Sequence, residues 1–391
     1  MRTQVGIVGA GPAGLLLSHL LHRHGIGSVV IERHSRTYVE ARVRAGVIEH
    51  DAARMLVEAG VGERMQCEGL VHRGINLTFV GRRHRIDLSD LTGGRTVMVY
   101  GQHEVVKDLI AARVAAGGDL RFNITDVKLH GIETSAPHVS FAENGHVTEL
   151  ACEFIAGCDG FHGICRPSMP ASALAVYERA YPFAWLGILA DAPPASEELV
   201  YARHADGFAL QSMRSPRITR AYLQCRPDED LALWPDRRIW DELRRRLEAD
   251  GLTLNEGPIL QRGVTPMRSF VVEPMQYGRL FLAGDAAHIV PPTGAKGMNL
   301  AIADVHVLAA ALVAYFKSGR SDLLEAYSAT CLRRIWKVQR FSWWMTSLLH
   351  RFPNADPMQE HLQLAELEQI AGSRAAQQVL AENYVGLPHE A

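Results

Sequence analysis

A glycine-rich turn near the amino terminus constrains the fold more than any other feature of this chain. Gly9, Gly11 and Gly14 follow the apolar run 4–8 and precede residues 15–24, whose apolar side chains recur with the period of a helix. In a strand–turn–helix unit the first glycine allows the tight turn, the second lets the backbone approach a pyrophosphate, and the third lets helix and strand pack closely. The pattern therefore predicts a nucleotide-binding unit in which a helix N-terminus faces phosphate groups.

A second strand and an acid complete this pattern. Residues 29–31 form a β-branched run that leads directly to Glu32. An acid at this place accepts hydrogen bonds from the ribose hydroxyls of a dinucleotide. We therefore expect a Rossmann-like unit, although this motif alone does not choose between FAD and NAD.

Composition excludes several classes of function. The 391 residues are 47% hydrophobic, enough for two domains or one large composite domain, and 41 basic against 43 acidic residues offer no electrostatic case for nucleic acid. The six cysteines are scattered, as in a cytoplasmic protein with reduced thiols, and the histidines lack a zinc-binding spacing, so no metal is expected. Asp304 and His306 interrupt the apolar stretch 300–316, which we expect to be too short and too polar for a membrane span.

Two further short motifs follow the glycine turn. Cys158-Asp159-Gly160 lies in the middle of the chain, and the segment 284–288 (Gly-Asp-Ala-Ala-His) follows the apolar run 280–283. Asp285 therefore stands at the carboxyl end of a predicted strand. The loop 291–299 then leads into a long apolar helix, whose N-terminus would direct positive potential at a group bound in the loop.

Taken together and in this order, the three motifs resemble those of the flavoprotein aromatic hydroxylases, the single-component FAD monooxygenases. The resemblance covers almost the whole chain and is carried by residues 33–47, 99–102, 154–165, 181–189, 268–300, 331–352 and 382–388. It implies an α/β fold with a Rossmann-like, glutathione-reductase-like FAD-binding domain and an inserted α+β substrate-binding domain. The implied boundaries are 1–175 plus 268–299 for FAD, 176–267 for substrate and 300–391 for a helical C-terminal and interface region.

The same resemblance implies an activity. FAD would be reduced by NADPH or NADH, react with O2, and pass oxygen from a flavin C4a-hydroperoxide to 4-hydroxybenzoate, giving 3,4-dihydroxybenzoate in aromatic compound degradation. The expected partner is this small aromatic acid, and the expected assembly is a homodimer.

Contact residues for both nucleotides are also implied by the resemblance. Those expected to bind FAD are Gly9, Gly11, Gly14, Glu32, Arg42, Arg44, Gln102, Asp159, Asp285, Met298 and Asn299. Those expected to bind NAD(P)H are Arg33, Tyr38, Arg42, His162, Arg166 and Arg268.

A substrate pocket can be argued from strand alternation. Residues 198–204, 208–214 and 218–225 read as consecutive antiparallel strands. A two-residue turn at Asp206-Gly207 predicts that Tyr201 lies opposite Ser212, and a three-residue loop predicts that Arg214 pairs with Ile218 and Ser212 with Arg220. One sheet face would then carry Tyr201, Ser212, Arg214, Arg220 and Tyr222. A solvated sheet face fits the same pattern, but the resemblance favours a pocket in which Arg214 holds a carboxylate.

Four residues are expected to act on the substrate hydroxyl. In the family, Tyr201 would bond this hydroxyl and favour its phenolate, Tyr384 would relay the proton, and His72, with a pKa near neutrality, would pass it to water. The carbonyl of Pro292 would orient the hydroxyl.

Three other interpretations remain open. The chain could hydroxylate a related phenolic or aminobenzoic acid, or be an FAD-dependent dehydrogenase without oxygen transfer. It could also be a nucleotide-bound regulatory protein without turnover. Tyr201 and Tyr384 argue against a dehydrogenase, which has no need to ionise a phenol.

Overall fold

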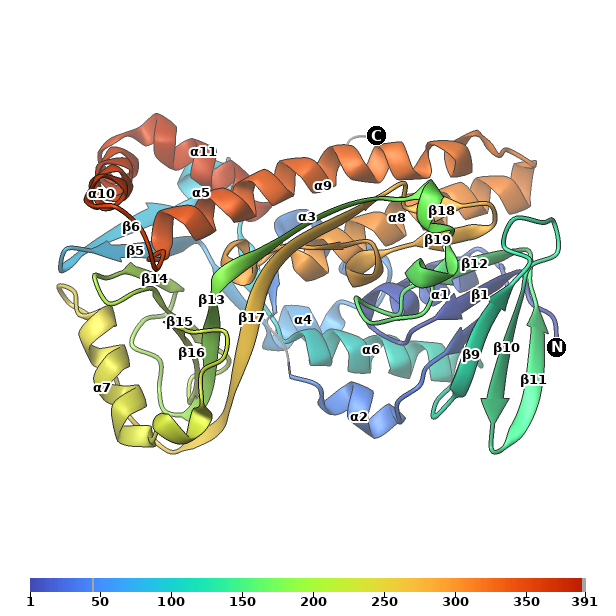
Figure 1. The fold of residues 1–391 in the computed structure, drawn as a ribbon, viewed down its shortest axis with the longest axis horizontal. Helices are drawn as coiled ribbons and strands as arrows, with labels where there is room; N and C mark the ends of the chain where they lie inside the picture. Colours follow the sequence, from blue (N-terminus) through green and yellow to red (C-terminus); the bar gives the residue numbers. More distant parts are fainter. Residues whose placement is uncertain (44–45, 389–391) are drawn as a thin grey trace.

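A six-stranded, mainly parallel sheet forms one half of the molecule (Figure 1). The computed structural model describes residues 1–43 and 46–388. In spatial order the strands are β18 (Gln276–Tyr277), β19 (Leu280–Leu282), β12 (Phe154–Gly157), β1 (Val5–Val8), β2 (Ser28–Ile31) and β8 (Asp119–Arg121). The inner strands are short apolar runs buried on both faces, as a parallel sheet covered by helices requires. The predicted strands at 4–8 and 29–31 are confirmed.

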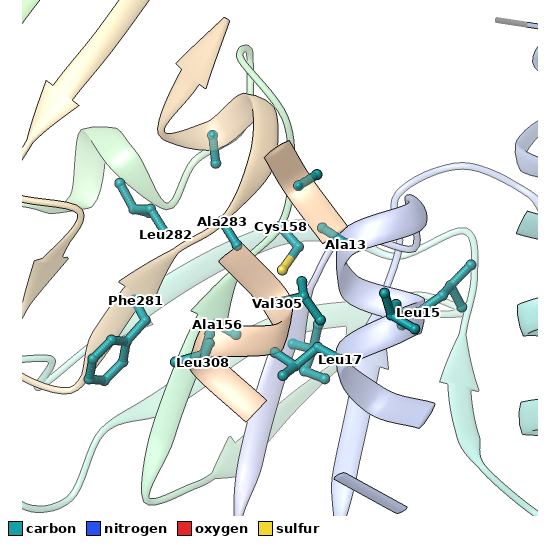
Figure 2. Close-up of a cluster of buried hydrophobic side chains, with 14 of the residues drawn as sticks. Ala13, Leu15, Leu17, Ala156, Cys158, Phe281, Leu282, Ala283, Val305 and Leu308 are labelled. Atoms are coloured by element: carbon teal, nitrogen blue, oxygen red, sulfur yellow. The ribbon is translucent and has the colours of Figure 1, made fainter. Parts of the chain in front are cut away.

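Two apolar helices cover this sheet. Leu17 of α1 (Pro12–Arg23) and Val305 and Leu308 of α8 (Gly297–Ser318) lie beside Ala156 of β12 (Figure 2). By length and composition α8 could cross a membrane, so the expectation that this stretch is too short and too polar was wrong. Its apolar side chains are largely buried in the core, which accounts for its hydropathy.

Smaller elements complete this half of the molecule. A three-stranded antiparallel sheet of β9 (Thr125–His130), β10 (His138–Glu143) and β11 (His146–Ala151) lies at its edge (Figure 1). A second small sheet contains β3 (Val47–Ile48), β7 (Val97–Val99) and β4 (Leu70–His72). The remaining helices of this half are α2 (Arg36–Ala41), α3 (His50–Glu58), α4 (Glu63–Glu68) and α6 (Gln102–Ala115), whereas α5 (Leu88–Leu91) lies in the other half (Figure 1).

The other half is built on an eight-stranded mixed sheet. In spatial order its strands are β20 (His288–Ile289), β17 (Ile259–Glu273), β13 (Ala175–Asp191), β16 (Ile218–Cys225), β15 (Ala209–Met213), β14 (Val200–Arg203), β5 (Gly74–Phe79) and β6 (Arg82–Asp87). The long antiparallel pair β13 and β17 runs from one half of the molecule into the other (Figure 1). The two halves are therefore joined by continuous strands.

Residues 74–87 belong to this second sheet, because β5 pairs in parallel with β14. The boundaries expected from the sequence placed these residues within the FAD-binding domain. Pairing between segments more than a hundred residues apart leaves no local signal, so this connection was not foreseen.

Helices cover both faces of the second sheet. The end of α9 (Asp322–Leu349), with α10 (Pro357–Gly372) and α11 (Arg374–Val385), packs on one face in a cluster that includes Tyr201 and Tyr384. Helix α7 (Asp236–Leu247) packs on the opposite face. The face predicted to hold substrate is thus the one that the C-terminal helices close.

Candidate functional site

The glycine turn has the geometry of a phosphate cradle. Gly9 has a φ of +107°, and a Cβ there would lie 2.3 Å from the Cys158 carbonyl oxygen. A Cβ on Gly14 would lie 2.0 Å from the Gly9 oxygen, whereas one on Gly11 would meet no protein atom within 4 Å. Gly11 is also the N-cap of α1 and supplies no side-chain cap, so the first N–H groups of the helix face open space. This arrangement fits a pyrophosphate that approaches at Gly11.

Glu32 is tied to this turn. One carboxylate oxygen accepts a hydrogen bond from the Ala10 N–H and the other from the His34 N–H, both at 2.9 Å. A carboxylate has further lone pairs, so Glu32 can still accept from a ribose hydroxyl. Its contact with the ribose stays a prediction.

Asp159 and Asp285 follow neighbouring parallel strands, β12 and β19, whose carboxyl ends point to the same edge of the sheet. One Asp159 oxygen accepts from the Cys165 N–H at 2.9 Å, and the other is buried without a partner among the residues that the structure describes. Burial raises the pKa of Asp159. Asp285 is exposed. An unpaired buried acceptor and an exposed acid at one edge fit hydroxyl donors of a bound dinucleotide.

The Gly-Asp turn around Asp285 is held from α8. One Asp304 oxygen accepts from the Gly284 N–H at 2.9 Å and from His288 Nε2 at 2.6 Å. Both side chains are buried, and Asp304 raises the pKa of His288 against the effect of burial. The sequence prediction did not include this pair, although a single acid inside an apolar helix was the available signal.

Pro292 lies in a tight turn directly before α8. Its carbonyl accepts from the Ala295 N–H at 2.9 Å and keeps a second lone pair, and Ala295 has a φ of +54°. The Asn299 side chain accepts from the Glu49 N–H and donates to the Val47 and Ala295 carbonyls. Asn299 therefore fixes the loop with its own amide, and its predicted flavin contact, like that of the half-buried Met298, stays untested.

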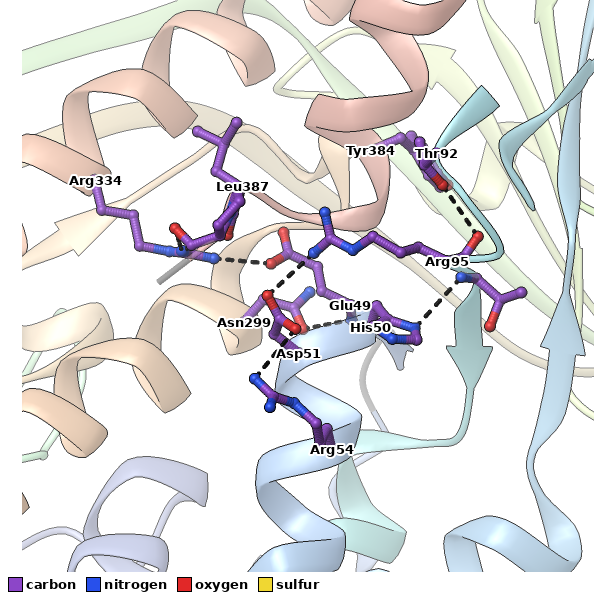
Figure 3. Close-up of polar contacts among 12 residues, drawn as sticks. Glu49, His50, Asp51, Arg54, Thr92, Arg95, Asn299, Arg334, Tyr384 and Leu387 are labelled. Carbon is purple, nitrogen blue, oxygen red and sulfur yellow. Dashed lines mark hydrogen bonds and ion pairs between the residues drawn. The ribbon is translucent and has the colours of Figure 1, made fainter. Parts of the chain in front are cut away.

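A buried charge cluster lies beside this loop. Lys296 donates to Glu49 at 2.6 Å and to the Tyr384 carbonyl at 2.9 Å. Arg334 donates to the second Glu49 oxygen at 3.1 Å (Figure 3). Burial lowers the pKa of Lys296 while Glu49 raises it. Two cations share one carboxylate, so positive charge is in excess at the α8 N-terminus, where a reduced flavin would collect negative charge. Sequence reasoning missed this cluster, because its members are far apart along the chain.

The substrate face was predicted with one error of register. Ser212 pairs with Arg220 and the Arg214 N–H bonds the Ile218 carbonyl, both as expected, but Tyr201 lies opposite Leu210 instead of Ser212. The turn causes the difference. Its hydrogen bond runs from the Gly207 N–H to the His204 carbonyl, so the connection is longer than the two residues assumed. A shift of two residues preserves the alternation of side chains, and the predicted residues still share a face.

Two phenols meet on this face. The Tyr201 and Tyr384 hydroxyl oxygens are 2.7 Å apart, and both side chains are buried. Burial raises the pKa of both, so the pair is neutral at ordinary pH and can pass a proton only along its hydrogen bond.

The two arginines of the face lack acidic partners within the described part of the chain. Arg214 donates to Ser212 Oγ and to the Met213 carbonyl, both at 3.1 Å, while its Nε is buried and unpaired. Arg220 lies over the Tyr222 ring at 5.1 Å and also has a buried, unpaired nitrogen. Unpaired guanidinium N–H groups are costly unless a ligand accepts from them, so they fit an anionic ligand.

The expectation for His72 was wrong in one respect. Its side chain is 1% exposed, its Nε2 lies 3.3 Å from Met213 Sδ, and burial lowers its pKa to about 4. The imidazole does not face water, and its pKa is not near neutrality, because the ring is buried against Met213 of the substrate sheet. Its participation in proton transfer stays a prediction.

The residues expected to bind NAD(P)H fall into two groups. Arg166 and Arg268 both stack on Phe161, at 4.8 and 4.6 Å, and the His162 ring contacts the same ring edge-on. The other group lies on or beside α2 and consists of Arg33, Tyr38 and Arg42. Arg44 lies outside the described residues. Gln102 is the half-buried first residue of α6.

Within the described residues, 1–43 and 46–388, no three metal-ligating side chains lie close enough together to hold a metal ion. The glycine turn and the acids beside it fit a dinucleotide.

A protein-family model described as an FAD binding domain matches residues 2–342. The chain is 48% identical over 391 residues to the p-hydroxybenzoate hydroxylase of Acinetobacter baylyi (strain ATCC 33305 / BD413 / ADP1), with 100% of this chain and 96% of that protein covered.

Solved structures share the fold. The p-nitrophenol 4-monooxygenase PnpA from Pseudomonas putida DLL-E4 matches with a TM-score of 0.82 at 19% identity, covering 99% of each chain. Aklavinone-11 hydroxylase, solved in a ternary complex with FAD and aklavinone, matches with a TM-score of 0.74 at 21% identity, covering 89% of this chain and 69% of that one. Together with the family match, these structures confirm the predicted fold class.

Proposed function

Because the chain belongs to the family with the FAD binding domain and is a flavoprotein aromatic hydroxylase, we propose that it converts 4-hydroxybenzoate to 3,4-dihydroxybenzoate. One observation carries the choice of substrate. A single sheet face presents unpaired guanidinium N–H groups and a hydrogen-bonded pair of phenols, which match the two ends of a hydroxylated benzoate.

FAD would be held at the edge of the parallel sheet. Gly11 and the N-terminus of α1 would face its pyrophosphate, Glu32 its adenosine ribose, and Asp159 and Asp285 its remaining hydroxyls. When bound and reduced, FAD supplies the activated oxygen that an aromatic ring cannot obtain from dioxygen directly.

The carboxylate end of the substrate would bind to Arg214. Its guanidinium can donate two parallel hydrogen bonds, and Ser212 already fixes the orientation of that group. Tyr222 and Arg220 add a hydroxyl and a second positive charge on the same face. This end of the site would set the orientation of the substrate and would exclude phenols that lack a carboxylate.

The hydroxyl end would bind between Tyr201 and the Pro292 carbonyl. Hydroxylation beside a phenol oxygen is faster when that oxygen is ionised, because the ring then carries more negative charge. Tyr201 would take the phenol proton as it hands its own proton to Tyr384 along their 2.7 Å contact, and Tyr384 would release its proton in turn toward solvent. Tyr201, again protonated, can then donate to the phenolate. The high pKa of both tyrosines keeps them protonated, so they relay the proton without becoming charged themselves.

The C-terminal helices would keep this reaction dry. They bury Tyr201, Tyr384 and the apolar cluster around them. Excluding water would prevent the reactive oxygen donor from decaying to hydrogen peroxide before it reacts with the substrate.

We further propose that NADPH or NADH docks at the arginine pair around Phe161, where two guanidinium groups can meet phosphates. The protein is expected to act in the cytoplasm, in keeping with its six free thiols, and as a homodimer, in keeping with the exposed Trp336 and Trp343 on α9.

The test is substrate-stimulated turnover. With FAD-loaded protein, 4-hydroxybenzoate should strongly stimulate NADPH oxidation and yield 3,4-dihydroxybenzoate, with benzoate, 4-aminobenzoate and 2,4-dihydroxybenzoate as comparison ligands and NADH as comparison reductant. Tyr201→Phe should lower product formation by about 10²- to 10⁴-fold, because the proton path is broken.

A matched control is available in the same buried cluster. Tyr181 also has a hydrogen-bonded hydroxyl, to Ser269 at 3.2 Å, and Tyr181→Phe should leave product formation nearly unchanged. Equal stimulation by benzoate, or oxidation without a dihydroxy product, would refute the proposal.

A further inference from the structure

The C-terminal turns of α9 contact the turn that carries Pro292. Thr346 Oγ1 lies 2.9 Å from Thr293 Oγ1 and 2.7 Å from the Ser342 carbonyl oxygen. All three residues are fully buried. No role was predicted for Thr346 or Thr293.

Thr346 is the donor in both contacts. Its single hydroxyl proton is shared between the Ser342 carbonyl oxygen, which only accepts, and Thr293 Oγ1. This shared hydroxyl therefore ties the side chain next to Pro292 to the backbone of α9.

The helix also limits where the turn can lie. A Cβ on Gly294 would come within 2.9 Å of Ser342 Oγ, so the turn rests directly on α9. The left-handed Ala295 closes the turn with its N–H on the Pro292 carbonyl. A side chain rarely adopts this backbone conformation unless surrounding contacts maintain it.

The next turn of the helix reaches the sheet. His350 donates from Nδ1 to the Thr346 carbonyl at 3.0 Å and accepts at Nε2 from the Trp185 indole at 2.7 Å. Trp185 lies against the Tyr222 ring, with centroids 4.7 Å apart. One short helical segment therefore spans from the Pro292 turn to the wall of the substrate face.

We propose that Thr346 is a positioning residue for hydroxylation: through Thr293 it sets the Pro292 carbonyl at the height needed to orient the substrate hydroxyl. The inference rests on the proposed function. Thr346 itself touches neither substrate nor cofactor. Losing its hydroxyl should leave the carboxylate end of the site intact while the phenol end loses its alignment.

The experiment compares Thr346→Val, which has the same shape without the hydroxyl, with Thr346→Ser, which restores it. Thr346→Val should raise the pKa of bound 4-hydroxybenzoate, read from its phenolate absorbance, and lower kcat about 3- to 10-fold with a smaller change in KM. It should also lower product formed per NADPH oxidised. Thr346→Ser should behave as the parent.

A double-mutant cycle with Thr293→Val separates positioning from general destabilisation. If the shared hydroxyl acts as described, the double variant is no worse than either single one. Additive losses, or an unchanged pKa of the bound phenol in Thr346→Val, would overturn the positioning role alone. A parent that forms no 3,4-dihydroxybenzoate would instead overturn the proposed function, and the inference with it.

Discussion

His350 is kept as a neutral imidazole in an aromatic environment. Its ring stacks on Phe183 and Phe208, with centroids 4.7 and 4.3 Å away, and both nitrogens are hydrogen-bonded. Burial lowers its pKa to about 3. Protonation would remove the acceptor that holds the Trp185 indole and would place an unpaired charge among aromatic rings.

This predicts a pH dependence of stability. In the unfolded chain the histidine titrates near its ordinary pKa of about 6.5, so between about pH 6.5 and 3 the unfolded state binds one more proton than the native state. Stability from this group is therefore complete above the unfolded pKa and is lost as pH falls through that window. His350→Gln, which keeps an acceptor for Trp185, should reduce the slope by about 1.4 kcal/mol per pH unit.

The measurement is the urea midpoint of parent and variant at about pH 7.5 and about pH 5. His72, whose pKa burial also lowers, contributes to both proteins alike and does not affect the difference. Identical acid sensitivity in parent and His350→Gln would contradict the assignment.

For single residues, the sequence predicted which side chains share the substrate face, but it did not predict their burial or their hydrogen-bond partners. The shared face of Tyr201, Ser212 and Arg220 followed from strand alternation, which tolerated an error of two residues. The burial of His72 could not be predicted, because it depends on which sheet covers β4. The partners of Glu49 come from α8 and α9, far along the chain, and have no local pattern.

At the scale of elements, Gly14 and Gly11 of the first turn and helix serve different functions: Gly14 permits packing, and Gly11 leaves space for a ligand. A methyl group on Gly14 would collide with the Gly9 carbonyl at 2.0 Å, whereas on Gly11 it would meet only the space proposed for the pyrophosphate. Gly14→Ala should therefore destabilise the apoprotein by about 1–3 kcal/mol and also weaken FAD binding. Gly11→Ala should leave the apoprotein as stable as the parent and weaken FAD binding alone.

Thermal midpoints of the apoproteins and FAD content after reconstitution measure both effects. The two variants control for one another, because each adds one methyl group to the same turn. Unimpaired FAD binding by Gly11→Ala would show that the pyrophosphate lies elsewhere.

Elements formed by local periodicity were predictable. The motif strands β1, β2 and β19 and the helices α1 and α8 all appear where hydrophobic pattern and glycine punctuation indicated. The pinning of the Gly284 turn by Asp304 was not predicted, since it requires knowing that α8 returns beside β19.

At the scale of the whole molecule, α9 runs along both halves (Figure 1). Near its start the Tyr327 hydroxyl donates to the Leu282 carbonyl of β19 at 2.7 Å, and near its end Thr346 holds the Pro292 turn. The strands β13 and β17 make a second link. We expect the two halves to unfold together.

FAD should then stabilise the entire chain. At about 100 times its dissociation constant it should add about 2.7 kcal/mol, since it binds only the native state. All six tryptophans lie in the substrate-sheet half or on α9, so their fluorescence reports on regions away from the glycine turn. Added FAD should raise the thermal midpoint measured by tryptophan fluorescence, and FAD should be released at that same midpoint. Separate midpoints would mean that the halves unfold independently.

The interleaving of the chain has a consequence for how such a protein can be altered. The outer strands β5 and β6 of the substrate sheet come from the first quarter of the sequence, and the helices over its face come from the last. Residues 176–267 grafted into a relative would carry a sheet without its outer strands and without the helices that cover its face. A new ligand preference in this architecture is therefore expected from substitutions at the site, not from transfer of that segment.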